Sequence, residues 1–443
     1  MDAKTVSVFG LGKLGAPMVA CFASKGHTVI GVDVNPDHVH LINQSLAPVF
    51  EPGLDMLLRT GHERISATDD YEVAIGRSEI SFIIVPTPSE ADGRFSTKHV
   101  LAAGENIGRA LRKKPDFHLV VLTSTVLPGA TEGELKPVLE AHSGKRCGVD
   151  FGLCYNPEFI ALGSIIHDIL IPDFIIIGQS DSRSGDLLAS FYKTVCENDP
   201  PIARMNIVNA ELTKLAVNSF LTMKISYANN LAEICERIPG ADVEVVTSAV
   251  GLDTRIGQKY IKGAVGYGGP CFPRDNAAFA HMARRMGAVP TLAEATDQVN
   301  QRQLTRLVEQ VMSKLPDGGK VGILGLSYKP NTDVVEKSQG IALARALADE
   351  GVPTMVYDPA AMDNARLVLG NAVAFSPSME DCIRQVNVIV ITTPWEEFRR
   401  IQPTHLTQNR SRPVLLDCWR MLDRQRFEGV AEYASAGVGP RRG

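Results

Sequence analysis

A glycine-rich loop near the N-terminus carries the most specific chemical signal in the sequence. The loop consists of Gly10, Leu11, Gly12, Lys13, Leu14 and Gly15. Between a strand and a helix, this spacing permits a tight turn and lets a pyrophosphate approach the positive helix N-terminus. Asp33 lies 18 residues past Gly15, after the next predicted strand, and would accept hydrogen bonds from a ribose 2′-hydroxyl. Because a carboxylate repels a 2′-phosphate, the motif predicts NAD rather than NADP. The bare pattern alone would indicate only a turn.

A second candidate is the segment 266–275, which reads Gly-Tyr-Gly-Gly-Pro-Cys-Phe-Pro-Arg-Asp. Its glycines and prolines predict a constrained loop, which can present the thiol of Cys271 to a bound ligand. Arg274 could favour the thiolate form, and Asp275 could orient a water molecule or the thiol. For an arbitrary cysteine, a buried thiol in a turn is the simpler interpretation.

Lys214 and Asn218 form a third candidate, four residues apart in a predicted helix. This spacing places an ammonium and an amide on one helix face, where both can bind the oxygen of a hydroxyl that becomes a carbonyl or an oxyanion. A surface lysine beside an asparagine is common, so a structural pair is the alternative interpretation.

Glu158 is the fourth candidate, within the segment Asn156-Pro157-Glu158-Phe159 that directly follows a predicted strand. Pro157 favours an extended Asn156, which would place Glu158 at the carboxyl end of the sheet, where open α/β folds bind ligands. Helix capping is the alternative role.

The helices and strands that must position these residues are predicted to form two α/β regions, with a helical region between them in the sequence. Strands are predicted at Thr5–Phe9, Thr28–Asp33, Ile80–Val85, Leu119–Thr123, Gly152–Tyr155 and Phe174–Gly178. Their alternation with helical segments predicts a parallel, doubly wound sheet. From about 206 to 302 the strand signal disappears, and 210–237 contains neither Pro nor Gly. We therefore expect a long central helix followed by shorter ones.

A second, smaller α/β region follows. Its predicted strands are Lys320–Leu326, Pro353–Tyr357, Val386–Ile391 and Val414–Asp417. We expect three domains, at 1–205, 206–302 and 317–443. The glycine-containing tail from Ala434 to Gly443 is typical of a frayed chain end.

Composition limits the functional class. The chain has 443 residues and a formal net charge of −5 without a basic block, so electrostatic nucleic-acid binding is not expected. No apolar run reaches the roughly 18 residues of a membrane span, and the first strand begins too early to leave room for a secretory signal. The eight cysteines are scattered, which favours reduced thiols and a cytoplasmic location. The histidine and cysteine spacing predicts no metal site.

Taken together, these segments resemble the UDP-glucose/GDP-mannose dehydrogenase family, most closely its UDP-glucose 6-dehydrogenase branch. The resemblance covers residues from about 4 to about 425 and includes Glu51-Pro52-Gly53-Leu54, Ser124-Thr125-Val126 and Leu324-Gly325-Leu326-Ser327-Tyr328-Lys329. It implies an α/β fold with two Rossmann-like, doubly wound parallel-sheet domains, joined by a long central helix and a helical dimerisation region. A homodimer or larger homo-oligomer is therefore expected.

The resemblance implies a four-electron oxidation of the C6 alcohol of an NDP-glucose, with UDP- or TDP-glucose as substrate and two NAD consumed. Cys271 would trap the intermediate aldehyde as a thiohemiacetal, which is then oxidised to a thioester and hydrolysed to the glucuronate. Lys214 and Asn218 would stabilise the reacting oxygen, and Asp275, Thr125 and Glu158 would position water and relay protons.

The resemblance also implies binding residues. For the cofactor these are the loop Gly10–Gly15 with Asp33, Thr87, Thr125 and Arg274. For the nucleotide sugar they are Glu158, Phe159, Lys214, Asn218, Arg255, Tyr267, Gly268, Gly269, Tyr328 and Lys329. Arg255 is expected to reach across a dimer interface.

Four positions depart from the family pattern. Leu162 replaces an acid and Glu336 replaces an arginine, both near the cofactor in the family. Pro270 replaces a serine before the cysteine, and Trp419 stands where relatives commonly carry an arginine that contacts the nucleotide. This last departure raises the hypothesis that the base is thymine rather than uracil.

Other functions remain open at this stage. A two-electron NAD-dependent hydroxyacid or alcohol dehydrogenase would need neither Cys271 nor a C-terminal domain. Another NDP-hexose or an NDP-N-acetylhexosamine could be the substrate. A nucleotide-binding regulator without turnover would not require Cys271, Lys214, Asn218 and Asp275 together.

Overall fold

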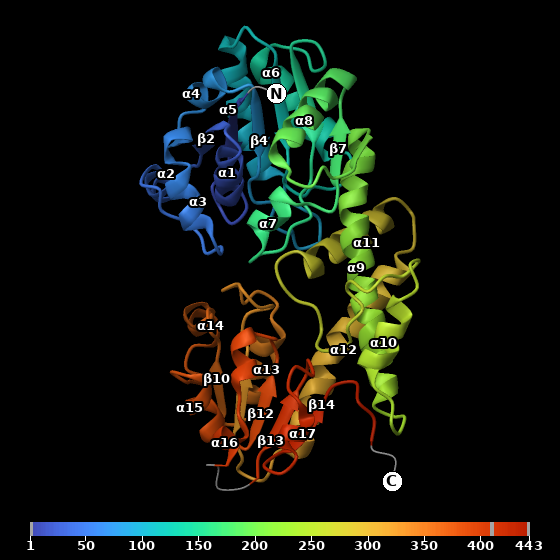
Figure 1. Cartoon of the computed structure of the whole chain (residues 1–443). Coiled ribbons are helices and arrows are strands. Elements are labelled where there is room, and N and C mark those ends of the chain that lie inside the picture. Colours follow the sequence, from blue (N-terminus) through green and yellow to red (C-terminus); the bar gives the residue numbers. More distant parts are fainter. Residues whose placement is uncertain (1–2, 408–411, 441–443) are drawn as a thin grey trace. The chain divides into compact units, whose positions relative to one another are not determined.

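The computed structural model describes residues 3–407 and 412–440 and divides into a first unit, 1–216, and a second unit, 217–443 (Figure 1). The boundary lies within one helix, α9 (Ile207–Cys235). The predicted helical region and the predicted C-terminal α/β region belong to the same unit.

The first unit is built on an eight-stranded sheet in the order β3-β2-β1-β4-β5-β6-β7-β8. Its strands are β1 (Thr5–Phe9), β2 (Thr28–Val32), β3 (Ile65–Thr68), β4 (Ile80–Ile83), β5 (His118–Leu122), β6 (Phe151–Tyr155), β7 (Ile175–Gln179) and β8 (Ile202–Met205). All six predicted strands of this region are present. The strands β3 and β8, which the sequence pattern did not reveal, extend the two edges.

One strand pair corrects the expectation of a wholly parallel sheet. β6 and β7 pair antiparallel through Cys154 with Gln179 and Tyr155 with Gly178, whereas the other pairs of this sheet are parallel. A parallel return requires a long crossover, usually a helix that spans the sheet. The connection here holds only the six-residue α7 (Ile165–Leu170), so β7 starts near the carboxyl end of β6.

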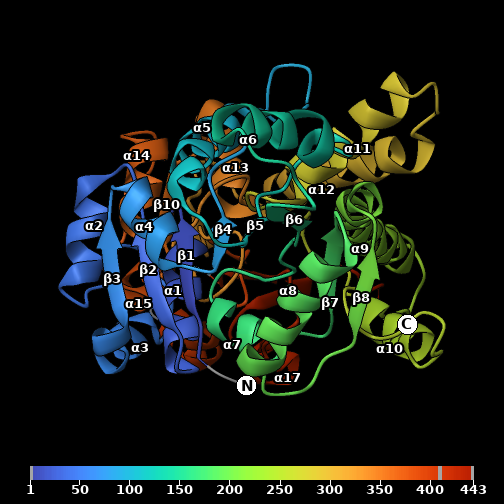
Figure 2. The same cartoon turned by 90° about the horizontal axis from the view of Figure 1, so that it is seen from above.

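Helices cover both faces of this sheet (Figure 2). One apolar core contains residues of α1 (Gly15–Ser24), α3 (Leu54–Thr60), α7 and α8 (Ser182–Val195). A second contains residues of α4 (Tyr71–Arg77), α5 (Lys98–Lys113) and α6 (Lys136–Ser143). Further short helices are α2 (Pro36–Asn43), η1 (His62–Arg64) and the π-helical η2 (Thr131–Leu135). The sheet is therefore covered on both faces, as a doubly wound fold requires.

The second unit begins with helices. After α9 come α10 (Val243–Gly251), α11 (Phe272–Arg285) and α12 (Thr291–Lys314). The prediction of a long helix at 210–237 is confirmed, with ends at Ile207 and Cys235. Cys271 directly precedes α11 as its N-cap residue.

A six-stranded parallel sheet completes the second unit in the order β11-β10-β9-β12-β13-β14. Its strands are β9 (Val321–Leu324), β10 (Thr354–Tyr357), β11 (Ala374–Phe375), β12 (Val388–Ile391), β13 (Val414–Asp417) and β14 (Glu432–Ser435). Its helices are α13 (Gln339–Asp349), α14 (Met362–Leu369), α15 (Met379–Arg384), η3 (Glu396–Arg400), α16 (Pro403–Leu406) and α17 (Arg424–Phe427). The predicted second α/β region is confirmed.

The two sheets begin with the same turn. After β1, Gly10 has a φ of +102°, and after β9, Gly325 has a φ of +108°. A Cβ added to Gly15 would lie 1.7 Å from the Gly10 carbonyl oxygen, and one added to Gly340 would lie 2.0 Å from that of Gly325. In both places a helix starts against the turn so closely that only glycine fits. The two α/β regions are structural counterparts.

The C-terminal tail is not frayed where the structure describes it, which corrects the sequence-based expectation. Ala434 and Ser435 belong to β14. Residues 437–440 then pair with 240–243, after the end of α9: the Gly240 N–H donates to the Pro440 carbonyl at 2.8 Å, and the Val243 N–H to that of Gly437 at 2.9 Å. Residues 441–443, part of the same expectation, lie outside the described residues.

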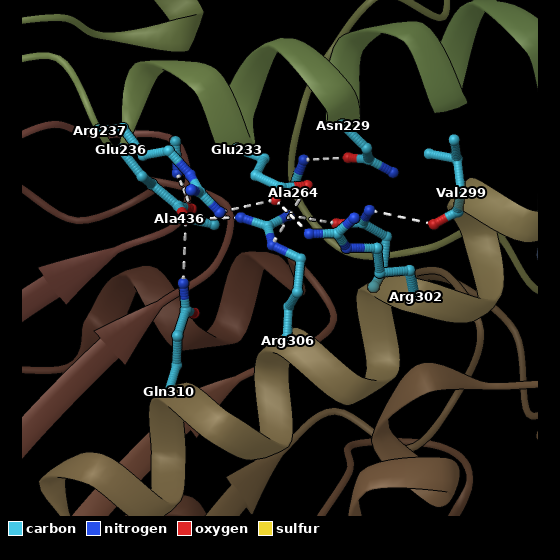
Figure 3. A network of polar contacts seen from close by, with 12 residues as sticks. Asn229, Glu233, Glu236, Arg237, Ala264, Val299, Arg302, Arg306, Gln310 and Ala436 are labelled. Atoms are coloured by element: carbon cyan, nitrogen blue, oxygen red, sulfur yellow. Dashed lines mark hydrogen bonds and ion pairs between the residues drawn. The ribbon is translucent and has the colours of Figure 1, made fainter.

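An ion-pair network anchors this tail (Figure 3). One carboxylate oxygen of Glu236, which directly follows α9, accepts the Gly437 N–H at 2.8 Å. The other accepts Arg306 Nη2 at 2.5 Å and Gln310 Nε2 at 3.3 Å, both from α12. Because the side chains of Arg306 and Glu236 are only 13% and 20% exposed, the pair lies largely out of solvent, where an unmatched charge is costly.

Replacing Glu236 by alanine should therefore destabilise the second unit. Arg306 would lose its carboxylate and Gly437 its acceptor, and we expect a loss of about 2 kcal/mol, below the value for a fully buried pair. Thermal melting followed by circular dichroism should show a midpoint lower by a few degrees. Glu309→Ala, which removes an exposed acid from the same helix α12, is the control. Equal midpoints for the two variants would contradict the anchoring role.

Candidate active site

The glycine-rich loop has the geometry of a dinucleotide site. A Cβ on Gly10 would lie 2.4 Å from the Ile84 carbonyl oxygen, so the turn packs tightly against the strand beside it. A Cβ on Gly12 would meet no atom within 4 Å. The space in front of Gly12, one turn before α1, is therefore open to a pyrophosphate. The loop lies at the topological switch point, where β1 neighbours both β2 and β4.

Asp33 directly follows β2 and is held by two main-chain N–H groups. Its Oδ2 accepts the Leu11 N–H at 2.6 Å, and its Oδ1 accepts the Asn35 N–H at 2.8 Å. These bonds fix the carboxylate beside the glycine loop. Its side chain remains 12% exposed, and His38 Nδ1 also lies 3.4 Å from Oδ2. Oδ1, which accepts one N–H, has a second lone pair for a ligand hydroxyl.

Thr87 and Thr125 follow the neighbouring strands β4 and β5. The Thr87 hydroxyl donates to the Thr125 carbonyl at 2.8 Å. Ser124 ties the same two loops, since its Oγ accepts the Val85 N–H at 2.9 Å and donates to the Val85 carbonyl at 2.7 Å. Hydrogen bonds therefore connect the two loops that carry Thr87 and Thr125 at the carboxyl end of the sheet.

Glu158, Phe159 and Lys214 come together in the first unit. Lys214 is buried, and its ammonium donates to the Glu158 main-chain carbonyl at 2.7 Å. The same ammonium lies 4.7 Å from the centre of the Phe159 ring, within cation–π range. Burial raises the pKa of the Glu158 carboxyl to about 7, where a carboxyl group can both give and take protons near neutral pH.

The second unit brings together Cys271, Asp275 and Asn218. Asn218 Nδ2 donates to Asp275 Oδ2 at 2.6 Å, and both residues are buried. Arg274 Nε lies 3.5 Å from Asp275 Oδ1. Cys271 is exposed and precedes α11, one turn before Asp275. The positive end of the helix dipole favours a thiolate there.

Lys214 and Asn218 lie one turn apart in α9, as the spacing predicted. Lys214 belongs to the cluster of the first unit and Asn218 to that of the second. A single helix therefore fixes the interval between the ammonium and the amide.

The loop before Cys271 packs against the start of the C-terminal α/β region. Gly269 has a φ of +85°, and a Cβ there would lie 2.6 Å from the Tyr328 ring. A Cβ on Gly268 would lie 2.3 Å from the Lys337 carbonyl oxygen. The Gly269 N–H donates to the Glu336 carbonyl at 3.0 Å. These glycines are needed for close approach, and the main chain of Glu336 supports the cysteine loop.

The remaining predicted binding residues differ in their surroundings. Tyr267 is buried and donates its hydroxyl to Asp297 Oδ1 at 2.7 Å. Lys329 Nζ lies 6.0 Å from the centre of the Tyr328 ring. Arg255 is 86% exposed and pairs with Asp253 at 2.6 Å, so the structure does not bring it to the cysteine loop.

Two of the departures from the family pattern have local explanations. Leu162 packs against the apolar core beneath α1 and α7, while the buried Glu51 accepts the N–H groups of Gly163 and Ile165 at 2.7 and 2.8 Å. An acid is thus supplied to this loop from another segment. Trp419 donates its indole N–H to the Thr392 carbonyl at 2.9 Å, after β12.

Three models of the UDP-glucose/GDP-mannose dehydrogenase family match the chain: the NAD-binding domain at 4–196, the central domain at 208–302 and the UDP-binding domain at 322–424. A UDP-glucose 6-dehydrogenase from Haloferax volcanii is 37% identical and covers 89% of this chain and 92% of its own. The chain belongs to the UDP-glucose/GDP-mannose dehydrogenase family.

Further relatives show both the fold and the range of substrates in this family. A UDP-glucose dehydrogenase structure from Pyrobaculum islandicum has a TM-score of 0.89, is 35% identical, and covers 99% of this chain and 98% of that one. A GDP-mannose 6-dehydrogenase from Pseudomonas aeruginosa is 35% identical over 80% of each chain. This family member is an NAD-dependent dehydrogenase whose glycine loop and Asp33 lie in the matched NAD-binding domain.

Two asparagines that the sequence analysis missed hold the segment before Cys271. Asn229, on α9, accepts the Ala264 N–H at 2.8 Å and donates to the Val265 carbonyl at 3.1 Å. Asn300, on α12, accepts the Tyr267 N–H at 2.7 Å and donates to its carbonyl at 3.0 Å. Each side chain supplies one donor and one acceptor, as a neighbouring strand would. No motif or spacing in the sequence marks either residue.

The described ranges hold no cluster of three or more histidine, cysteine, aspartate or glutamate side chains arranged for a metal ion. Of the helices in these ranges, none combines the length and apolar character needed to cross a bilayer.

Replacing Asp33 by asparagine should weaken NAD binding about tenfold. An amide offers one acceptor oxygen instead of two, and the N–H groups of Leu11 and Asn35 already compete for it. Because the charge that repels a 2′-phosphate is lost, NADP should gain relative to NAD. Isothermal titration calorimetry with both dinucleotides measures this. Asp37→Asn, at an exposed position nearby, should leave both affinities unchanged, and wild-type NAD affinity in Asp33→Asn would refute the assigned role.

Proposed function

We propose that this dehydrogenase oxidises the C6 alcohol of an NDP-glucose to the NDP-glucuronate in two successive hydride transfers to NAD. The observation that carries the proposal is the exposed thiol of Cys271 at the start of α11, one turn before a buried Asp275 that is bound by Asn218. A two-electron alcohol oxidation has no use for this thiol, whereas oxidation of an aldehyde to an acid does.

The need for the thiol follows from the chemistry. Hydride can leave only from a tetrahedral carbon, so the aldehyde formed in the first oxidation must first gain a nucleophile. In our proposal, Cys271 Sγ adds to that aldehyde to form a thiohemiacetal. Loss of a second hydride then gives a thioester, and water hydrolyses it to the acid and the free thiol. NAD, when bound, accepts one hydride in each oxidation, and three protons are released overall at neutral pH.

The side chains of both clusters have roles in this sequence. Lys214 and Asn218 would stabilise the reacting oxygen. Glu158, with its pKa of about 7, would take and return protons. Asp275 would orient Asn218 through their 2.6 Å hydrogen bond. Thr125 would help position water.

The NADH yield tests the proposal directly. Purified protein with UDP-glucose and excess NAD should form two NADH per sugar, since both oxidations occur on one enzyme. Cys271→Ala should abolish formation of the acid, because the aldehyde can no longer be held as a thiohemiacetal. Cys147→Ala removes a half-buried thiol elsewhere in the first unit and should keep the yield of two. One NADH per sugar, or acid formation without Cys271, would instead indicate a two-electron dehydrogenase.

The same assay with other nucleotide sugars identifies the base and the sugar that the enzyme accepts. TDP-glucose, GDP-mannose and UDP-N-acetylhexosamines are the alternatives to UDP-glucose. Relatives named for UDP-glucose and for GDP-mannose support a nucleoside diphosphate hexose. Trp419, whose indole is bound to the Thr392 carbonyl, supports the narrower hypothesis of TDP-glucose. Equal kcat/KM for UDP- and TDP-glucose would refute that preference.

We also propose that the enzyme is a homodimer formed through its helical region. Phe220, Tyr227 and Ile234 lie seven residues apart on α9, which places them on one face, and they are 58%, 53% and 46% exposed. Val245 and Leu252, on and just after α10, are 69% and 72% exposed. An apolar stripe of this kind, in a family for which a dimerising helical region is expected, is best covered by a second copy.

Phe220→Asp with Tyr227→Asp should therefore yield monomers, because two carboxylates would have to be desolvated in the interface. Light scattering after size-exclusion chromatography measures the mass. Leu367→Asp, which changes an 85% exposed leucine on α14, should leave the dimer intact. A wild-type monomer, or a dimer that survives the double substitution, would refute this assembly.

A further inference from the structure

A chain of hydrogen bonds connects Glu158 with the interior of the first unit. Asn156 Nδ2 donates to the Ile176 carbonyl at 2.9 Å. Asn156 Oδ1 lies 2.5 Å from Tyr192 Oη, and that hydroxyl lies 3.2 Å from Glu158 Oε1. Asn156 and Tyr192 are 1% and 3% exposed, so water does not compete freely for these groups. No role in the reaction has been assigned above to Asn156 or Tyr192.

The direction of each bond in this chain follows from the chemistry of its groups. The Ile176 carbonyl can only accept, so the amide NH₂ of Asn156 must face it. Asn156 Oδ1 then faces Tyr192, and this oxygen can also only accept. A tyrosine hydroxyl has one proton, and the shorter contact is to Asn156. The oxygen of Tyr192 therefore presents a lone pair to Glu158, which suits a protonated carboxyl group as the donor.

We propose that Asn156 and Tyr192 are positioning residues that keep Glu158 protonated in the resting enzyme. Asn156 holds the only hydroxyl proton of Tyr192, and so withholds it from the Glu158 carboxylate. The inference rests on the proposed function for the use made of Glu158, but its protonation state can be measured without turnover.

Burial, a hydrogen bond and nearby charges act on the protonation of Glu158. Desolvation is the largest cause that raises its pKa to about 7, while a hydrogen bond donated by Tyr192 to the carboxylate and the charge of Lys214 act in the opposite direction. The titratable groups around it are Tyr192 on α8, Lys214 on α9, Asp168 on α7, Cys21 on α1 and Cys196 after α8. Lys214 is the one cation among these five groups, and its ammonium is bound to the Glu158 main-chain carbonyl. Asp168 opposes ionisation of Glu158, as the thiols would if ionised.

A carboxyl group held in this way has a use in the proposed reaction. With its proton released to solvent, a carboxyl group that titrates near neutral pH can take a proton from the attacking water and then return it to the leaving thiolate. A Glu158 that received the Tyr192 proton would be a weaker base, because a hydrogen bond to the charged form lowers a pKa.

Infrared titration of the wild-type protein without substrate is the first test. The C=O stretch of a protonated carboxyl group should be present at about pH 6 and disappear above about pH 8. Glu158→Gln should lack this band, which assigns it. A wild-type Glu158 that is already ionised at about pH 5 would overturn the proposal.

The double-mutant cycle of Asn156 and Tyr192 is the second test. Asn156→Ala frees the Tyr192 proton to bind the carboxylate, so the pKa of Glu158 should fall by about one unit. In the Tyr192→Phe background there is no proton to free, and the same substitution should not lower it. Water entering the vacated space would lower the pKa in both backgrounds. An equal fall in both, or no fall in either, would therefore refute the proposal.

Tyr433→Phe is the matched control. Tyr433 is likewise buried and donates to a buried carboxylate, Asp417 Oδ2, at 2.8 Å, but in the second unit. Its loss should lower the melting temperature without moving the Glu158 band. Because infrared titration needs no turnover, these results stand even if the substrate assays fail. Conversely, two NADH per sugar with an ionised Glu158 would keep the proposed function and remove this inference.

Discussion

One helix, α9, carries buried polar side chains that each bind a different segment of their own unit. Glu211 accepts the N–H groups of Gly129 and Thr131 at 2.6 and 2.8 Å, and Lys214 donates to the Glu158 carbonyl. Asn218 binds Asp275, and Asn229 binds the segment before Cys271. The partly buried Glu236, directly after the helix, binds Arg306 and the tail. A buried polar group without its partner costs as much as a lost hydrogen bond or more. Each of these hydrogen bonds therefore fixes its segment at one position along the helix within its own unit.

The two α/β regions show how one scaffold takes two roles. Asp33 and Asp358 occupy equivalent places, after the second strand of each region, and each accepts the N–H of the residue after the first glycine, Leu11 or Leu326. Asp33 remains partly exposed. Asp358 is 1% exposed, and its Oδ2 also faces the Trp395 indole N–H at 3.1 Å. The equivalent acid thus keeps a partly exposed carboxylate in the NAD-binding domain and closes the loop internally in the other domain.

Features that follow a local sequence pattern were predicted well, whereas contacts between residues far apart in the sequence were predicted poorly. The strand alternation, the glycine loop and the long helix each depend on residues that are close together in the sequence. A single sequence is therefore enough to predict them. The antiparallel β6–β7 pair depends on a connection too short to cross the sheet, and Asn229, Asn300 and Tyr192 act through partners far away in sequence. The prediction of a frayed tail was wrong because the glycines of this segment suggested conformational freedom. A Cβ on Gly439 would lie 2.0 Å from the Ile238 carbonyl oxygen, so that glycine is there for close packing.

Two carboxyl groups, Glu158 and Asp275, illustrate why residue type alone does not assign a role. Asp275 faces groups that can only donate, since the Asn218 amide lies at 2.6 Å and the Arg274 guanidinium at 3.5 Å. The hydrogen bond from Asn218 holds the Asp275 side chain as an acceptor in a fixed orientation. Glu158 instead faces a hydroxyl whose proton, in our proposal, belongs to Asn156. A buried carboxyl group that receives no hydrogen bond from a donor can exchange protons near neutral pH. A buried carboxyl group that does receive such hydrogen bonds acts as a fixed acceptor. The division of labour in the proposed reaction, orientation by Asp275 and proton transfer by Glu158, follows from this difference in neighbours.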